Sequence, residues 1–321
     1  MWLCINLRDH EFHVRPRRSS RIRRVAAGLL VGILAGCGGG SGPTAPVPST
    51  GPGGYPGGAD IIAWGDSWTS GIGASNGNSF PEQLAVLTGR SVFNAGVSGQ
   101  TSDQIVARQG SAPALLTLPN DTIPASGSVA IEDQSTFPVT AEGPGPIAGT
   151  LSGVHGTLSF ASRLVFTRDF PGSSVSLAPQ SPFTPDAFDS RTVINVFWIG
   201  GNNFFNPGEV KADIASAVGF LSAGKFVVLG ILNAGSEPAG TPSYNDIVQL
   251  NADLAAAYPD NFIDARGILV EGYDLSNPAD VLDHANDVPP TSLRNDDQHP
   301  NDAGYALIAA QVAAFIQNQA W

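Results

Sequence analysis

A serine, a histidine and an aspartate in this sequence have the types and settings needed for nucleophilic catalysis. Ser67 follows Gly65 and Asp66 at the end of the apolar run Ile61–Trp64. Glycine, aspartate and serine all favour turns, so a simple turn is one interpretation of this stretch. The other is a nucleophile, because open α/β sheets bind ligands beyond the carboxyl ends of their strands. A serine hydroxyl in that place needs a base to accept its proton and an acid to orient the base.

The histidine best placed to be that base is His299. Two other histidines follow residue 37, namely His155 and His284. His155 lies in SGVHGTL, which is typical of a hairpin, and His284 directly follows an aspartate that it would rarely face. His299 lies in NDDQHP, where Asp296 can fold back onto the imidazole and fix its tautomer. The same stretch leads into the last expected helix, and the two roles are compatible.

Two further loops are expected at the same edge of the sheet as Ser67. Residues Asn94–Ser102 follow a short strand, and their glycines let a backbone N–H approach a ligand closely. Residues Trp198–Phe204 follow an apolar strand and carry an asparagine amide outward. Since the carboxyl ends of parallel strands share one edge, a hydroxyl, a glycine N–H and an amide should meet there.

The elements that must position these groups alternate between strands and helices from residue 60 onward. The expected strands are the apolar stretches 61–64, 92–93, 193–199, 225–232 and 261–265. The expected helices, each with one apolar stripe, lie near 79–87, 209–222, 245–257 and 302–318. This alternation predicts an α/β fold of three layers, with a doubly wound parallel sheet of five strands between helices.

Residues 110–190 do not follow this pattern. They contain no lysine, ten prolines and no helical stripe, but several short runs that alternate between apolar and polar residues. We therefore expect an antiparallel β subdomain inserted into an α/β domain made of residues 60–109 and 191–321. Both attachment points lie near the expected site, so the insertion is expected to shape substrate choice.

The N-terminal residues resemble an export signal. Residues 15–24 hold six arginines and no acid, and a 12-residue apolar run, Val25–Gly36, follows. This run is too short to span a bilayer stably, so residues 1–36 are predicted to be a signal peptide. The stretch Leu34–Cys37 resembles a bacterial lipobox, which predicts lipidation of Cys37. An ordinary signal peptide remains the alternative, and export by the twin-arginine route is left open.

Residues 37–59 are predicted to tether the protein to a membrane. Fourteen of the 22 residues from 38 to 59 are glycine or proline, a composition typical of a flexible linker. The expected location is the periplasm or the cell surface. Gly38 after the cysteine favours the outer membrane, if the source has two membranes.

The predicted mature chain is acidic and almost free of cysteine. The full chain has a net charge of −12 and residues 1–36 contribute +5, so the remainder carries −17. Such a surface argues against nucleic acid and anionic headgroups as partners. Only Cys4 and Cys37 are present, which excludes a disulfide, a cysteine nucleophile and a thiolate metal site from the mature protein.

Four stretches together resemble the SGNH hydrolases, the GDSL esterase and lipase family. They occur in the family's order, and the resemblance covers about 60–105 and 190–318: WGDSW, NAGVSGQTS, IGGNN and DDQHP. The resemblance implies a flavodoxin-like fold in which Ser67 is the nucleophile and His299 the base, oriented by Asp296. It implies an oxyanion hole made by the backbone N–H groups of Ser67 and Gly99 and by the Asn202 side chain.

Two residues depart from the family pattern. Trp68 stands where the name-giving motif has leucine, and Asn203 replaces an aspartate that commonly follows the third-block asparagine. Both, with Phe204 and Phe205, are candidates for a substrate pocket, although Trp68 and each phenylalanine could equally be core packing. The departures bear on substrate fit rather than on the chemistry.

The implied chemistry is hydrolysis of carboxylic esters with short acyl groups, through an acyl-serine and without a cofactor or metal. Deacetylation of a polysaccharide is the leading specific alternative. A third possibility is a surface lipoprotein without catalysis, whose β insertion binds a glycan or a partner.

Overall fold

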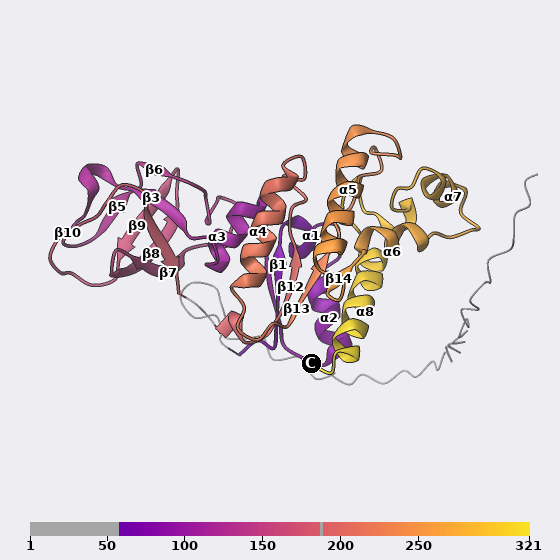
Figure 1. Cartoon of the computed structure of the whole chain (residues 1–321), viewed down its shortest axis with the longest axis horizontal. Helices are drawn as coiled ribbons and strands as arrows, with labels where there is room; N and C mark the ends of the chain where they lie inside the picture. Colours follow the sequence, from indigo (N-terminus) through magenta and orange to yellow (C-terminus); the bar gives the residue numbers. More distant parts are fainter. Residues whose placement is uncertain (1–57, 187–188) are drawn as a thin grey trace, which may run out of the picture. The chain divides into compact units, whose positions relative to one another are not determined.

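A computed structural model describes residues 58–186 and 189–321 of the chain (Figure 1). The predicted signal peptide, Cys37 and the tether up to residue 57 lie outside the described residues. The described residues form a parallel sheet and an antiparallel sheet, each with its own apolar core. None of the helices formed by 58–186 and 189–321 is long and apolar enough to cross a bilayer.

The parallel sheet has five strands in the order β14-β13-β12-β1-β2. The strands are β1 (Ile61–Gly65), β2 (Val92–Gly96), β12 (Ile194–Trp198), β13 (Phe226–Leu229) and β14 (Phe262–Ile263). The central strands β1 and β12 are buried along their whole length, which explains why their sequences are almost entirely apolar. The chain leaves β1 toward β2 and later returns to the other side of β1, so the order reverses between β1 and β12. Ligands of doubly wound sheets bind at such a reversal.

Helices pack on both faces of this sheet, as predicted. On one face α2 packs against α8, and on the other α3 packs against α4, which contacts α5 (Figure 1). A capping box of Ser79 and Glu82 starts α2, and the Asn301 side chain caps α8. The helices are α1 (Ser67–Ser70), α2 (Phe80–Thr88), α3 (Ser102–Gln109), α4 (Pro207–Gly219), α5 (Pro242–Ala257), α6 (Ala265–Glu271), α7 (Pro278–Ala285) and α8 (Asp302–Asn318). Short 3₁₀ helices lie at Pro119–Asp121, Asp189–Arg191 and Thr291–Leu293.

The antiparallel sheet confirms the predicted β insertion. Its seven strands have the order β5-β9-β8-β7-β11-β3-β6, and β4 and β10 form a separate pair. Its core includes Leu158, Phe166 and Phe183, and Ala107 of α3 belongs to the same core. The strands are β3 (Ala114–Thr117), β4 (Thr122–Ile123), β5 (Ser128–Ala130), β6 (Asp133–Gln134), β7 (Ile147–Leu151), β8 (Val154–Phe160), β9 (Leu164–Arg168), β10 (Val175–Ser176) and β11 (Ser181–Pro185).

Candidate active site

Ser67 begins a single helical turn, α1, directly after β1. The carboxylate of Asp66 caps this turn by accepting a hydrogen bond from the Trp68 backbone N–H, at 3.1 Å. The end of β2 passes so close to α1 that a Cβ at Gly96 would lie 2.1 Å from the Ser70 nitrogen. Ser67 itself stays half-buried. The sequence thus forms the expected turn, and the turn leaves the serine accessible at the carboxyl edge of the sheet.

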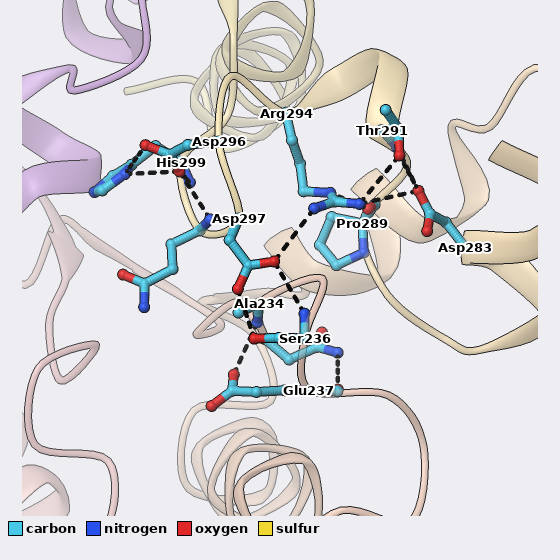
Figure 2. Close-up of polar contacts among 12 residues, drawn as sticks. Ala234, Ser236, Glu237, Asp283, Pro289, Thr291, Arg294, Asp296, Asp297 and His299 are labelled. Carbon is cyan, nitrogen blue, oxygen red and sulfur yellow. Dashed lines mark hydrogen bonds and ion pairs between the residues drawn. The ribbon is translucent and has the colours of Figure 1, made fainter. Parts of the chain in front are cut away.

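The structure brings Ser67, His299 and Asp296 together in one hydrogen-bonded chain. The imidazole Nε2 lies 3.0 Å from the Ser67 Oγ, and Nδ1 lies 2.8 Å from Asp296 Oδ2 and 3.0 Å from Oδ1. Asp296 Oδ1 also accepts the backbone N–H groups of Gln298 and His299, at 2.8 and 2.7 Å. Figure 2 shows the Asp296–His299 pair. With Nδ1 against the carboxylate, Nε2 is free to accept the serine proton.

The carboxyl group of Asp296 is held in its charged form. Partial burial alone would raise its pKa, but the two backbone N–H donors and the His299 ring outweigh burial and lower the pKa below its usual value. An ionised carboxylate beside Nδ1 stabilises the imidazolium that forms when Nε2 accepts a proton.

Asp297 fixes the loop that carries this pair. Its carboxylate accepts two hydrogen bonds from Ser236, one from the backbone N–H at 3.0 Å and one from the hydroxyl at 2.6 Å. Its backbone carbonyl accepts the N–H of Gly235 at 2.9 Å. Within the loop, the Asn295 N–H donates to the His299 carbonyl at 2.8 Å. The His299 loop is therefore tied to the segment that follows β13 (Figure 2).

Arg294 supports the same loop from its other side. Its guanidinium lies 3.0 Å from Asp283 and 3.7 Å from Asp297, and its Nε donates to the Pro289 carbonyl at 2.7 Å (Figure 2). The side chains of Arg294 and Asp283 are only 13% and 16% exposed, so their charge-assisted bond is shielded from water. No sequence motif singled out Arg294, whose partners lie on α7, in the stretch after it and in the His299 loop itself.

The predicted oxyanion donors lie on adjoining loops. Gly99 has a φ of +77°, a backbone conformation that favours glycine. The Asn202 side-chain amide donates to the carbonyl of Gln100, the next residue, at 2.9 Å. The Asn202 amide carries a second N–H that this bond does not use. Asn202 is exposed, so the second N–H can reach a ligand at the rim.

The four pocket candidates fall into two groups. Trp68 and Asn203 are buried, so they support the site and do not line a substrate pocket. The Trp68 indole N–H donates to the Gln298 carbonyl at 3.1 Å. The Asn203 amide oxygen accepts the Ser102 backbone N–H, and its nitrogen donates to the Ser102 hydroxyl. Phe204 is half-buried and packs edge-to-face against Phe205, which is 61% exposed. The two phenylalanines are therefore accessible to a ligand.

Asp66 is an unusual residue that the sequence showed only as part of a turn. It is 1% exposed, and its Oδ2 has no hydrogen-bond partner among the described residues. Burial raises its pKa to about 7, against the opposing effect of the Trp68 N–H. A carboxyl group with a pKa near neutrality thus lies directly beside Ser67 in the chain.

The other two histidines have different surroundings. His155 lies on β8 between Asp169 and Asp186, at 2.6 and 2.8 Å. His284 stacks on Tyr273 with ring centroids 3.9 Å apart. Residues 58–186 and 189–321 contain no group of three or more His, Cys, Asp or Glu side chains that could hold a metal ion.

Comparison with known proteins gives distant similarities. No protein-family model matches the sequence. A tail spike protein of Salmonella phage epsilon15 is 26% identical over 275 residues, which is 74% of this chain, and the chain spans only 25% of that relative's length.

The solved structures that the chain resembles share still less sequence with it. A member of the lipolytic G-D-S-L family from Veillonella parvula has a TM-score of 0.45 and 14% identity, over 79% of this chain and 96% of its own. A carbohydrate acetylesterase from Sinorhizobium meliloti has a TM-score of 0.37 and 12% identity, over 81% and 98%. Function must therefore be inferred from the residues of the site.

Proposed function

We propose that this protein is a serine hydrolase of the SGNH family that cleaves carboxylic esters with short acyl groups. The observation that carries the proposal is the hydrogen-bonded chain from Ser67 through His299 to Asp296 at the reversal point of the sheet. The chain places a nucleophile, a base and an orienting acid in one line, which is the arrangement that serine hydrolysis requires.

In the first half of the reaction, the Ser67 Oγ attacks the ester carbonyl while His299 Nε2 takes the hydroxyl proton. Asp296 keeps the imidazole oriented and stabilises its positive charge. The oxyanion is held by the backbone N–H groups of Ser67 and Gly99 and by the free N–H of the Asn202 amide. Each such donor typically contributes about 10²–10³ in rate.

The first half ends when the ester C–O bond breaks and the imidazolium gives its proton to the departing alcohol, which leaves Ser67 acylated. In the second half, water attacks the acyl carbonyl while His299 takes a proton from it. The bond between the acyl carbon and Ser67 Oγ then breaks, the imidazolium returns its proton to Oγ, and the acid is released. The residues named here account for every proton transferred.

The test is turnover of p-nitrophenyl acetate by the purified protein and by Ser67→Ala. We expect Ser67→Ala to reduce kcat by about 10³ or more, because the nucleophile is lost. Ser70→Ala is the matched control: it removes a hydroxyl from the same turn, which donates to the Ser67 carbonyl at 3.1 Å and does not touch the reacting atoms. Appreciable turnover by Ser67→Ala would refute the proposal, and so would an inactive wild-type protein that is folded.

A further inference from the structure

The β insertion contains a cavity that the chemistry above does not use. It has a volume of about 330 Å³ and lies between the segment 139–146 and the residues 159–161 that end β8. This volume is within the range of small-molecule pockets, about 300–1,000 Å³. We call it the insertion pocket.

The insertion pocket lies against the loop that carries Gly99. Gly143, which lines the pocket, is so close to Val97 that a Cβ on it would lie 3.5 Å from the Val97 Cγ1. The carbonyl of Pro138, next to the pocket residue Val139, accepts a hydrogen bond from the Gln100 side-chain amide at 3.2 Å. The pocket segment therefore contacts the loop on both sides of Gly99.

These contacts connect the pocket directly to the proposed catalytic groups. The Val97 N–H donates to the carbonyl of Gly65, at the end of β1, at 3.0 Å. The backbone carbonyl of Gln100 accepts a hydrogen bond from the side-chain amide of Asn202. Val97 and Gln100 are 4% and 1% exposed, so both links run through packed interior rather than through a loose loop.

Further polar contacts hold Thr136, which lies just before the pocket segment, and the Gly99 loop beside it. The Thr136 hydroxyl donates to Asp103, in the first turn of α3, at 2.5 Å. Arg108, on the same helix, donates from Nε to the Gln100 side chain at 3.1 Å and is 1% exposed. A ligand in the pocket would thus have a fixed position relative to the Gly99 loop.

The lining indicates what the pocket can hold. It contains no charged side chain, so a charged ligand would be desolvated there without a partner. Phe160 offers a half-buried ring, braced edge-to-face by Phe137 with centroids 6.4 Å apart. The hydroxyls of Thr140 and Ser159 donate only long bonds to protein carbonyls, at 3.3 and 3.4 Å, and can still accept hydrogen bonds.

An aromatic face combined with hydroxyl and backbone polar groups suits a neutral sugar ring. The C–H face of a pyranose packs on an aromatic side chain, and its hydroxyls need neutral donors and acceptors. A plain acyl chain would leave the polar groups of the pocket unpaired. The acidic charge of the chain also disfavours a sugar acid.

We propose that the insertion pocket binds a neutral sugar residue of an acylated polysaccharide, while the ester on a neighbouring residue reacts at Ser67. The inference rests on the proposed ester hydrolase function and names its substrate class. Binding at a distance from the reacting carbonyl would then raise kcat/KM for the glycan and leave a minimal ester unaffected.

The experiment compares p-nitrophenyl acetate with acetylated xylan and acetylated glucomannan oligosaccharides. We expect Phe160→Ala to lower kcat/KM on the best glycan by about tenfold and on p-nitrophenyl acetate by less than about twofold. Phe170→Ala is the matched control, since Phe170 is another phenylalanine of the insertion but is 79% exposed and does not line the pocket. It should change neither activity.

A second variant covers the case in which Phe160→Ala unfolds the insertion. Ala161→Trp fills the pocket from an exposed position and removes no packing, and it should produce the same selective loss. Calorimetry with Ser67→Ala measures glycan binding without turnover, so the pocket is tested even if the protein proves inactive on every ester. Binding should be lost in Ser67→Ala/Phe160→Ala.

Several outcomes would overturn the inference. They are equal losses on both substrates, unchanged glycan activity in both pocket variants, and no binding of either neutral glycan to Ser67→Ala. A shift in acyl-chain preference across p-nitrophenyl esters, with glycan binding intact, would instead assign the pocket to the acyl group. Failure of wild type on p-nitrophenyl acetate would refute the ester hydrolase and not the glycan pocket.

Discussion

The carboxylate of Asp297 accepts both the backbone N–H and the hydroxyl of Ser236, at 3.0 and 2.6 Å. The two residues are 61 positions apart in the chain, and their contact joins the His299 loop to the loop after β13. We infer that the position of His299 depends on this contact. In the proposed reaction Asp297 is then a positioning residue, with no chemical role of its own.

Replacement of Asp297 tests this dependence. We expect Asp297→Ala to lower kcat on p-nitrophenyl acetate by roughly 10- to 100-fold and to leave KM within about twofold, because the His299 imidazole is displaced and the substrate contacts are not. Asp297→Asn, which keeps one acceptor oxygen, should recover part of the loss. Asp260→Ala, at an exposed aspartate, is the control. If kcat falls only to the extent that the variant unfolds, as a lower melting temperature would show, the positioning role is contradicted.

The choice of histidine can be tested by a pair of substitutions. His299→Ala should reduce kcat by about 10³ or more, since it removes the imidazole that lies 3.0 Å from the Ser67 hydroxyl. His284→Ala should retain activity, because that ring stacks on Tyr273. Steady-state kinetics on p-nitrophenyl acetate separate the two. If His284→Ala were the inactive protein, the assignment of the base would be wrong.

Adjacent asparagines should give opposite phenotypes. Asn202→Ala removes a proposed oxyanion donor from an exposed side chain, so kcat should fall about 10²–10³-fold with the melting temperature almost unchanged. Asn203→Ala leaves the backbone N–H of Ser102 without its acceptor in the interior, while the Ser102 hydroxyl still donates to Asp213. The unpaired N–H should cost about 1–3 kcal/mol of unfolding free energy. Kinetics and urea unfolding of both variants check this. Equal losses of unfolding free energy in the two variants would contradict the distinction between Asn202 as an oxyanion donor and Asn203 as a structural amide.

Asp66 should make stability depend on pH. The pKa of Asp66 is raised to about 7 in the folded protein. Between the ordinary pKa of an aspartate and pH 7, the carboxyl group is therefore protonated in the folded state and ionised in the unfolded state. Stability from this group is therefore lost as the pH rises from about 4 to about 7. Asp66→Asn keeps the cap but removes the titration, so its unfolding free energy relative to wild type should increase between pH 5 and pH 8. Urea unfolding at both values measures this, and a constant difference would show that Asp66 does not titrate in this range.

We also propose that the mature protein begins at Cys37 and carries a lipid there, which would anchor it to a membrane outside the cytoplasm. The basis is the lipobox-like stretch that ends at Cys37. Mass spectrometry of the protein from a bacterial membrane fraction should find an acylated Cys37 as the first residue. Cys37→Ala should release the protein from the membrane fraction, and an unmodified N-terminus elsewhere would contradict the proposal.

The strands of the α/β core could be predicted because each is a short apolar run bounded by turn residues. The helices were located less well. Pro207 and Pro242 occupy the first positions of α4 and α5, so these helices begin two or three residues before the periodic apolar stripes that predicted them. Helix α3 was not predicted, since its apolar residues are few, although Thr101 and Gln104 form a capping box that could have indicated it.

The residues at the centre of the site were also accessible from sequence, for a local reason. Asp296 and His299 are three residues apart, and Ser67 lies in a stretch of five distinctive residues. The support of the site could not be predicted in the same way. Pairs such as Asp297 with Ser236, or Gln100 with Pro138, are set by the packing of distant loops and leave no short-range pattern.

In chain order, the main sheet of the insertion begins with β3 and ends with β11. These two strands are antiparallel neighbours, with Ala114 opposite Phe183. Cα atoms paired in this way are about 5 Å apart, so the chain leaves the α/β core and returns to it at almost the same point. Removing or replacing the intervening residues would require only a short bridge, because the parallel sheet contributes no strand to the insertion. The insertion is in this sense a unit that could be exchanged as a whole. On the proposed function, such an exchange would change the glycan that is recognised and leave in place the α/β core that carries Ser67, Asp296 and His299.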